Sequence, residues 1–422
     1  MTPQDRAFLA FLFQAAVDAA DPHKALAAYL PERPKGRTVV IGAGKGAAQL
    51  AAAFEDLWDA PVEGVVVTRY GYACATRHVR VLEAAHPVPD QAGLAASEAL
   101  FAAVAGLGPD DLVVALICGG GSALLAAPAE GLTLADEVAL NEALLSSGAP
   151  IGAMNAIRKQ VSRIKGGRLA AAALPARMVS LIVSDVPGDD PAQVASGPTV
   201  PDAVGRAEAR AAIRDHGIAL PERIARFLDE SAEDAPCPDD ARFDRHEVHV
   251  IASAARSLEA AAEVAEAAGV AAVILSDAIE GEAREIAKMH AAMAREVARR
   301  GRPFKAPVVL LSGGETTVTI RDTSGRGGRN TEFLLSLALD IEGQAGIAAL
   351  AADTDGIDGS EDNAGAFADG ETAARMRAAG CDPGAMLAAH DAWTAFDAID
   401  ALFVTGPTGT NVNDLRAILI RV

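Results

Sequence analysis

The sequence is poor in cysteine, and its four cysteines lie far apart, at Cys74, Cys118, Cys237 and Cys381. They form no C-x-x-C pair and have no zinc-ligand spacing, so neither a zinc ribbon nor a dithiol redox site is expected. Scattered single cysteines are typical of the reducing cytosol, where disulfides are rare. We therefore expect reduced thiols and a cytoplasmic protein.

Positive charge is also scarce. The chain has 37 Lys and Arg against 57 Asp and Glu, a formal net charge of −20, which argues against nucleic acid or an anionic membrane as a main partner. No apolar run reaches the roughly 18 residues that a membrane span needs. The start of the chain lacks the positive segment of a signal peptide, because Asp5 stands beside Arg6. Its apolar residues instead predict an amphipathic helix with one face made by Phe8, Phe11, Leu12 and Ala15.

Several well-known catalytic motifs are absent. GAGKG is no Walker loop, because no Ser or Thr follows its lysine. No G-x-S-x-G occurs, so a Ser-His-Asp hydrolase built on Ser122 of GGGSALL is unsupported. DTDGIDGSEDN resembles a calcium loop, but Ile357 occupies the third ligand position and the glycine is misplaced. Asp353, Asp355 and Asp358 therefore remain either magnesium ligands or turn formers.

Apolar segments, in contrast, recur regularly along the chain. It has 422 residues, 50% of them hydrophobic, which is enough for a large core and two domains. Runs such as RTVVIGAG, EGVVVTRYG and DLVVALICG alternate with helical segments, which predicts an α/β fold with a mostly parallel sheet covered by helices on both faces. The acidic segment 229–247 contains Pro236 and Pro238 and is the expected linker. This places a boundary near residue 240, between domains 1–240 and 241–422.

Glycine-rich and acidic turns follow these apolar runs. In open parallel sheets ligands bind at the carboxyl ends of the strands, and glycine lets backbone amides approach a phosphate or carboxylate closely. One such turn is a common tight connection, but three glycine-rich and two paired-Asp turns together predict a polyanionic ligand with carboxylates for a cation. His86, in AAHPVPD, is either a ligand contact or a hydrogen-bonded turn histidine. The expected ligand-binding residues are Gly44, Gly46, Gly120, Gly121, Ser122, Gly313, Gly314 and Glu315, with Asp189 and Asp355 as cation-binding residues.

A basic segment precedes the first of the paired-Asp turns. Residues 150–168 include five Lys and Arg and no acidic residue. If the segment is one helix, Asn155, Lys159, Ser162 and Gly166 share a face. In an acidic chain this helix would attract an anionic substrate, with Asn155 and Lys159 as contacts. The alternative is a solvated face that binds nothing.

The most distinctive segment is SGRGGRNTEF, residues 324–333. It carries Arg326 and Arg329 and continues into a helix that contains Asn330 and Glu332. Arginine on a turn at a helix start can hold a carboxylate or a transferring phosphoryl group, and Asn330 is a further candidate contact. The alternative is a surface turn whose arginines pair with nearby acidic residues.

Taken together, these segments resemble the class II glycerate kinases, the glycerate 2-kinases of the MOFRL type. The resemblance implies an N-terminal Rossmann-like domain, a smaller C-terminal α/β domain and an active site in the cleft between them. It also implies magnesium-dependent phosphorylation of D-glycerate by ATP at the 2-hydroxyl, with the family's active-site lysine and arginine at Lys45 and Arg329. The similar segments run in order from about residue 5 to residue 415: GAGKGA, AAHPVPD, CGGGSALL, NAIRKQVSRIKGGRLA, VSDVPGDDP, VASGPTVPD, LLSGGETTV, GRGGRNTE and AADTDGIDG.

The chemistry of phosphoryl transfer fits these residues. The reaction needs a metal and neutralisation of charge on the transferring group. Lys45, with the amides of Gly44 and Gly46, is expected to stabilise that group, and Arg329 to hold the glycerate carboxylate or the developing charge. Asp189 and Asp355 are the candidates for holding Mg²⁺ or for accepting the hydroxyl proton. The expected partners are thus D-glycerate and ATP, and a homo-oligomer remains open.

An NAD(P)H-dependent hydroxypyruvate reductase is the chief alternative, since similar proteins have carried that name. GAGKGA meets the dinucleotide fingerprint only in its weaker form, with Ala47 last. The next strand ends in Thr68-Arg69, where a dinucleotide site should show an acidic residue; Arg69 could instead receive a 2′-phosphate. A third class, a non-catalytic sugar-acid sensor, would keep the glycine turns but need neither magnesium nor Lys45.

Overall fold

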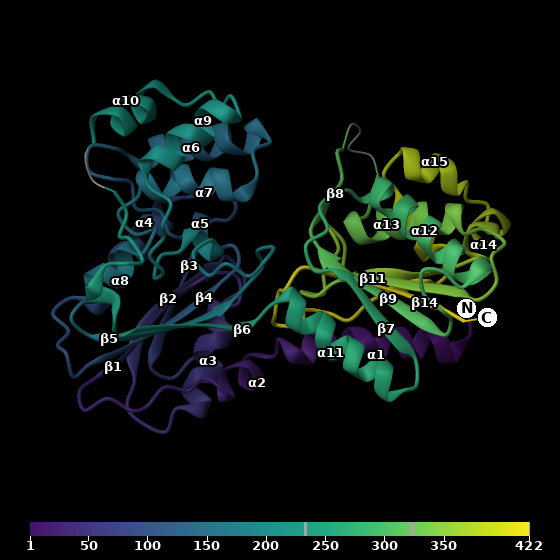
Figure 1. The fold of residues 1–422 in the computed structure, drawn as a ribbon, viewed down its shortest axis with the longest axis horizontal. Helices are drawn as coiled ribbons and strands as arrows, with labels where there is room; N and C mark the ends of the chain where they lie inside the picture. The colour runs from purple at the N-terminus through teal and green to yellow at the C-terminus, as the bar shows by residue number, and fades with distance from the viewer. Residues whose placement is uncertain (232–233, 321–324, 422) are drawn as a thin grey trace. The chain divides into compact units, whose positions relative to one another are not determined.

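The chain folds as two units that each contain a six-stranded sheet (Figure 1). This computed structural model describes residues 1–231, 234–320 and 325–421. The N-terminal unit is Pro22–Ile251, and the C-terminal unit combines Met1–Asp21 with Ala252–Val422. These units differ from the domains 1–240 and 241–422 at both ends. The last strand of the first sheet, β6 (His246–Ala252), lies beyond residue 240, and the first helix packs with the C-terminal unit.

The sheet of the N-terminal unit has the strand order β3-β2-β1-β4-β5-β6, which is that of the Rossmann fold. The ladders from β3 through β2, β1 and β4 to β5 are all parallel. Every residue of β1 and β4 is buried, as expected where helices cover both faces of a sheet. The Rossmann-like prediction is therefore confirmed. The remaining strands and helices are β1 (Thr38–Ala43), β2 (Glu63–Arg69), β3 (Val79–Ala84), β4 (Leu112–Cys118), β5 (Arg177–Val183), α2 (Pro22–Ala27), α3 (Ala47–Leu57), α4 (Gln91–Val104), α5 (Gly121–Leu124), α6 (Leu134–Ser147), α7 (Ile151–Gln160), α8 (Arg168–Ala173), α9 (Arg206–Asp215) and α10 (Glu222–Glu230).

The basic segment is not one helix. Helix α7 ends at Gln160 and α8 begins at Arg168, with Gly166 and Gly167 between them at φ of 62° and 80°. A Cβ on Gly167 would lie 2.9 Å from the backbone of Pro201, so glycine is required there for close approach as well as for its φ. The helix ends before this point. The prediction that Ser162 and Gly166 share a helical face with Asn155 and Lys159 is therefore wrong.

The sheet of the C-terminal unit has the order β13-β12-β11-β14-β9-β7 and is mostly antiparallel. Among the ladders that the structure describes in this sheet, β7–β9 is parallel and the other four are antiparallel. The expectation of a mostly parallel sheet is therefore wrong for this unit. Three of its strands, β9, β11 and β14, are buried along their whole length. A fully apolar strand has the same sequence pattern in a parallel and in an antiparallel sheet, so the pattern does not predict the direction of pairing. The strands are β7 (Ala271–Ser276), β8 (Gly281–Glu282), β9 (Val308–Gly314), β10 (Thr316–Thr317), β11 (Ile347–Asp353), β12 (Gly365–Asp369), β13 (Leu402–Phe403) and β14 (Asp414–Ile420).

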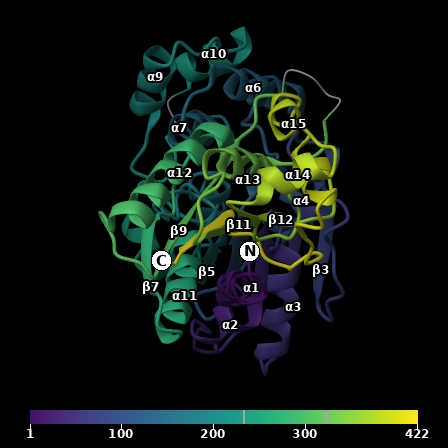
Figure 2. The same ribbon diagram turned by 90° about the vertical axis from the view of Figure 1, so that its right-hand side faces the viewer.

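Helices cover both faces of this second sheet. On one face lie α1 (Pro3–Ala19) and α11 (Ala254–Ala267), and on the other α12 (Ala283–Arg300) and α13 (Arg329–Asp340) (Figures 1 and 2). The amphipathic first helix is confirmed, but Phe11 is 60% exposed. Its buried face is instead made by Leu9, Leu12, Phe13, Ala16 and Val17. Three short helices complete the unit: α14 (Thr372–Ala378), α15 (Pro383–Ala388) and α16 (Ala392–Asp397).

Two further expectations concern the whole chain. All four cysteines are free thiols. Of the helices that the structure describes, none combines the length and the hydropathy needed to cross a membrane.

Candidate active site

Lys45 lies in the turn between β1 and α3. Gly44 has φ 132°, and a Cβ there would lie 2.3 Å from the carbonyl oxygen of Cys118. The amides of this turn are already bonded within the protein: Gly44 N donates to Val67 O at 3.1 Å and Gly46 N to Cys118 Sγ at 3.2 Å. Gly44 and Gly46 therefore shape the turn without offering these N–H groups to a ligand, and the group that the turn can present is the ammonium of Lys45.

Lys45 shares its surroundings with His86. A Cβ placed on Gly120, which has φ 77°, would lie 3.0 Å from Lys45 Cγ and 3.2 Å from His86 Nε2. Burial and the nearby charges of Lys45 and Arg69 lower the pKa of His86 to about 4. Within the described residues the His86 ring has no hydrogen bond, so the bonded turn histidine is not what this structure contains. A neutral imidazole and a lysine thus border the same space above Gly120.

A chain of hydroxyl and amide groups links two of the predicted site residues. Ser122 Oγ lies 2.8 Å from Ser196 Oγ, which donates to Asn155 Oδ1 at 2.9 Å. Ser196 has φ 61° on a non-glycine residue, a conformation that is uncommon and frequent at functional sites. Ser122 and Asn155 are thus brought together through Ser196, which the sequence did not single out.

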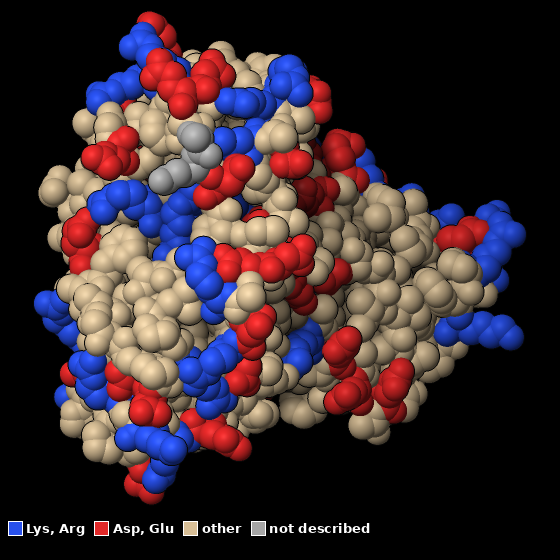
Figure 3. All heavy atoms as spheres, turned by 60° about the vertical axis from the view of Figure 1, so that its left-hand side comes forward, with Lys and Arg blue, Asp and Glu red and all other residues tan. Residues whose placement is uncertain are grey.

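The basic segment is not a free positive surface. The buried ammonium of Lys159 pairs with Asp202, and Lys165 Nζ pairs with Glu137 Oε1 at 2.6 Å. Arg163 pairs with exposed Glu98. Lys159 is therefore paired inside the protein. The geometry of this segment does not support the prediction that it attracts an anionic substrate. Figure 3 likewise shows Lys and Arg mixed with Asp and Glu on the face that it draws.

The loop after β5 carries the predicted carboxylates of the N-terminal unit. Asp189 is half-buried with φ 54°, and its amide donates to Val186 O at 3.1 Å. Asp190 is a turn former, because its Oδ1 accepts from the amide of Ala192. Asp185, which begins this acidic turn, has its carboxylate against Gly119, where a Cβ would be 2.0 Å from Asp185 Oδ2.

In the C-terminal unit, Arg329 is the first residue of α13 and is surrounded by three carboxylates. Its Nε donates to Asp414 at 2.8 Å, its Nη2 to Asp353 at 2.7 Å and its Nη1 to Glu315 at 3.0 Å. Burial disfavours the charge on Arg329, but the charges of Asp414, Asp353 and Glu315 outweigh this effect and raise its pKa. Burial and the charge of Asp414 raise the pKa of Asp353 well above its usual value, against the opposite effect of Arg329.

Two buried residues of β14 complete this cluster. Asp414 accepts from Asn330 Nδ2 and from Arg416 Nη2, both at 2.7 Å. Arg416 also donates to Gly313 O at 3.1 Å. Neither side chain has any exposed surface. Neither residue is among those predicted from the sequence, although an Asp and an Arg two positions apart on one face of the apolar strand DLRAILI indicate a buried ion pair.

The DTDGID segment forms turns and a helix cap. Asp355 Oδ1 accepts from Ile357 N at 2.9 Å, a short-range turn bond. Buried Asp358 accepts from the amides of Asn330 and Thr331 at 2.9 and 2.8 Å, and so caps the start of α13. Asp355 therefore forms a turn, whereas Asp358 holds the start of a helix from a distant part of the chain.

Two other predicted groups have local structural roles. Arg326 lies 3.7 Å over the ring of Trp393 and pairs with Glu361 at 2.5 Å, as the surface-turn alternative expected. Ser324 of the same segment lies outside the described residues. A Cβ on Gly314 would lie 2.2 Å from Ile279 N, so this glycine permits close packing between backbones.

In the described ranges 1–231, 234–320 and 325–421, no three His, Cys, Asp or Glu side chains are grouped so as to hold a metal ion. Mg²⁺ is usually bound through one or two carboxylates together with substrate phosphates. Asp189 belongs to the N-terminal unit and Asp355 to the C-terminal unit. Each is a single carboxylate of the kind that can complete such a site.

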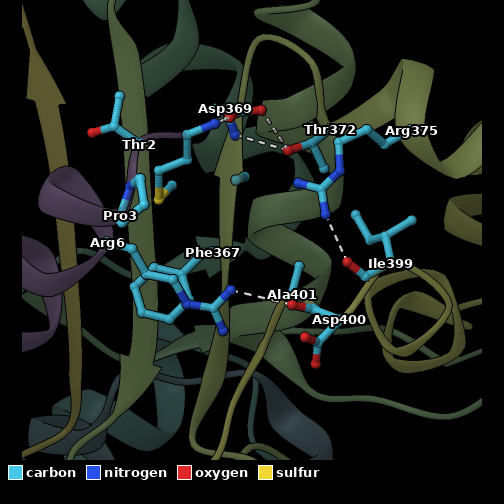
Figure 4. A pocket seen from close by; sticks show the side chains of 12 residues that line it. Thr2, Pro3, Arg6, Phe367, Asp369, Thr372, Arg375, Ile399, Asp400 and Ala401 are labelled. Carbon is cyan, nitrogen blue, oxygen red and sulfur yellow. Dashed lines mark hydrogen bonds and ion pairs between the residues drawn. The ribbon is translucent and has the colours of Figure 1, made fainter.

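A cavity of about 420 Å³ lies elsewhere on the C-terminal unit, between α1 and residues 367–401 (Figure 4). Its two arginines are both bonded to backbone carbonyls: Arg6 Nη1 to Asp400 O at 3.2 Å and Arg375 Nη2 to Ile399 O at 2.6 Å. These bonds hold the loop before β13, and we assign no ligand to the cavity.

Comparison with known proteins covers nearly the whole chain. Residues 8–229 match a domain of unknown function, DUF4147, and residues 308–414 match the MOFRL family. A protein of Agrobacterium vitis named "Putative hydroxypyruvate reductase" is 54% identical over 98% of this chain and 94% of its own. D-glycerate 2-kinase of Thermotoga maritima is 38% identical over 94% of both chains. The crystal structure of a glycerate kinase from the same organism matches 99% of this chain and 100% of its own, at 36% identity and a TM-score of 0.88. The chain therefore belongs to the MOFRL-type glycerate kinase family.

Proposed function

We propose that this chain is a glycerate 2-kinase, which transfers the γ-phosphoryl group of ATP to the 2-hydroxyl of D-glycerate. The supporting observation is the similarity, over 94% of both chains, to the D-glycerate 2-kinase of Thermotoga maritima. The four free thiols fit a cytoplasmic enzyme.

Lys45 is the residue that we propose to stabilise the transferring group. It stands at the start of α3, where the helix dipole favours a negative charge. Its ammonium has no hydrogen bond or ion pair to any residue in the described part of the chain, and so can pair with a phosphate oxygen. Neutralising charge on the γ-phosphoryl oxygens is the principal task of the protein in this reaction.

Arg329 is proposed to bind an anionic oxygen of the substrates, either the glycerate carboxylate or a phosphate. Mg²⁺, when bound with ATP, would supply further neutralisation of the phosphates. Asp189 and Asp355 are proposed to contact the metal or to accept the hydroxyl proton of glycerate. This assignment fails if Asp189→Asn and Asp355→Asn both keep turnover within about threefold of the unmodified enzyme, which is under ~1 kcal/mol of barrier.

The reductase alternative is not favoured by the end of β2. Thr68 Oγ1 donates to Lys45 O at 3.0 Å, and Arg69 lies 4.3 Å over the ring of Tyr72. The acidic residue that holds the ribose of a dinucleotide is therefore lacking at this strand end. A Rossmann strand order alone does not imply a dinucleotide.

A paired turnover assay tests the proposal. One arm offers D-glycerate, ATP and Mg²⁺, and the other offers hydroxypyruvate with NADH or NADPH. We expect ADP and 2-phosphoglycerate in the first arm only, with activity lost on chelation of magnesium. Oxidation of NADH or NADPH without release of ADP would replace the kinase assignment by the reductase.

A further inference from the structure

The guanidinium of Arg329 is held on two sides that differ in exposure. On one side its Nε and Nη2 are bonded to Asp414 and Asp353, whose side chains are 0% and 8% exposed. On the other side its Nη1 is bonded to Glu315, whose side chain is 59% exposed. Arg329 therefore has two partners in the protein interior and one that water and solutes can reach.

The interior side is fixed because Asp414 is itself held. It accepts from Asn330 and Arg416, and Arg416 is anchored to Gly313 O and Thr316 Oγ1. Turning the guanidinium away would take a charge-assisted donor from a fully buried carboxylate, which is costly. The direction in which Nη1 points is thus set by the protein core.

The contact on the exposed side is weak by comparison. Glu315 lies between β9 and β10, and an ion pair to so exposed a carboxylate contributes little to stability, because water screens the attraction. Its Oε1 stands 3.0 Å from Nη1, which is where an anionic oxygen must lie to be bound by Arg329. Any carboxylate or phosphate oxygen can make the same charge-assisted bond.

We infer that Glu315 is a displaceable counter-ion of Arg329, whose carboxylate occupies the position that an anionic oxygen of the substrates takes on binding. The inference rests on the proposed function, in which Arg329 binds such an oxygen. It replaces the expectation that Glu315 itself binds the substrate, because a carboxylate repels a carboxylate or a phosphate. The incoming oxygen belongs either to D-glycerate or to the phosphates of ATP.

Calorimetric titration of the full chain separates these two sources. D-glycerate and MgATP are titrated in separate arms into the unmodified protein, Glu315→Gln and Glu361→Gln. Glu361 is the matched control, since it also pairs with an arginine of the same segment, Arg326, whose partner ring is Trp393. Glu315→Gln should bind one of the two ligands about two- to fivefold more tightly, or about 0.4–1 kcal/mol. Glu361→Gln should bind both as the unmodified protein does.

The ligand whose affinity rises identifies the oxygen that meets Arg329. Unchanged or weaker binding of both ligands by Glu315→Gln, in a protein that still turns over D-glycerate, overturns the inference and leaves the proposed function standing. An equal rise of affinity in Glu315→Gln and Glu361→Gln also overturns the inference, because the loss of any negative charge would then explain the tighter binding. Failure of the unmodified protein to bind either ligand overturns both the proposed function and this inference.

Discussion

At the scale of single residues, the two cations proposed for the reaction have opposite surroundings. Lys45 borders Gly120 and the neutral ring of His86, without an ion pair among the described residues, whereas Arg329 is enclosed by carboxylates. Removing Arg329 would leave Asp353 and Asp414 as buried charges without their partner, which is strongly destabilising. Removing Lys45 leaves no such group behind. Substitution of Lys45 is therefore the cleaner test of chemistry.

We expect Lys45→Ala to lower kcat by about 10²–10³-fold, because a single donor aimed at developing charge contributes about 3–4 kcal/mol to the transition state. Steady-state kinetics with D-glycerate and MgATP measures this effect. Lys35→Ala, at an exposed site, is the control and should leave kcat unchanged. A kcat for Lys45→Ala within threefold of the unmodified enzyme would remove Lys45 from the proposed mechanism.

His290 gives a second prediction, on acid stability. It is 1% exposed, with Nε2 3.0 Å from Ser312 Oγ, and burial lowers its pKa to about 4. The unfolded chain, with a histidine pKa near 6.5, then binds more protons than the folded one between these values. The buried neutral His290 therefore contributes fully to the free energy of unfolding above about pH 6.5. This contribution is lost as the pH falls towards 4, by up to ~3 kcal/mol.

Urea unfolding of the unmodified protein and of His290→Gln between pH 7 and 4 tests this expectation. As the pH is lowered from 7 to 4, the free energy of unfolding should fall less in His290→Gln than in the unmodified protein, because glutamine does not titrate. His216→Gln, at an exposed histidine, should follow the unmodified protein. Equal pH slopes in the unmodified protein and in His290→Gln would contradict the prediction.

At the scale of elements, helix α13 depends on a cap supplied by another segment. Its N-cap residue is Gly328, which has no side chain to bond the first amides. Asp358, from the loop after β11, accepts from the amides of Asn330 and Thr331 and from the Thr331 hydroxyl. This cap joins the DTDGID segment to the helix that begins with Arg329. Both the stability of the protein and the position of Arg329 therefore depend on it.

Asp358→Ala should therefore destabilise the protein by about 1–3 kcal/mol, since it leaves buried N–H groups unpaired. It should also raise the KM for the substrate that Arg329 binds. Asp382→Ala is the matched control, because Asp382 caps the exposed start of α15 through Gly384 N at 2.9 Å. The control should lose about 1 kcal/mol and keep its KM. If both variants shift KM alike, the link between the cap and Arg329 is wrong.

Elements that depend on nearby residues could be predicted from the sequence, and those that depend on distant pairing could not. The strand, turn and helix around Lys45 follow from consecutive residues, and the Rossmann-like sheet is confirmed. The end of α7 at Gln160 and the direction of β14 depend on segments far along the chain. The same is true of Lys159, whose charge meets Asp202 only after folding. An apolar strand carries its burial in its composition, but not the identity or direction of its neighbour.

At the scale of the whole molecule, each unit is supported by its own clusters of buried apolar residues. The described residues contain no grouping of side chains able to hold a metal by themselves. Magnesium, in this proposal, enters with ATP and acts on the reaction without supporting the fold.

We therefore expect a chelator such as EDTA to abolish turnover without changing the melting temperature of the protein alone. Turnover should return on addition of Mg²⁺ in excess of the chelator. Differential scanning calorimetry with and without EDTA, beside the ADP-release assay, measures both effects. A melting temperature lowered by several degrees in EDTA would instead indicate a structural metal site.

The C-terminal unit is built from both ends of the chain, and this sets an order of events during synthesis. Ser257 Oγ donates to Ala16 O at 2.8 Å across 241 residues, and Leu12 and Phe13 pack with Leu258 and Leu311. Ribosomes add about 5–20 residues per second and domains fold as they emerge. The first helix therefore leaves the ribosome before the rest of its unit, and its apolar face stays uncovered while the N-terminal unit folds. Leu258 on α11 and Leu311 on β9, which cover that face, are synthesised only after the whole N-terminal unit, so the face can be buried only then.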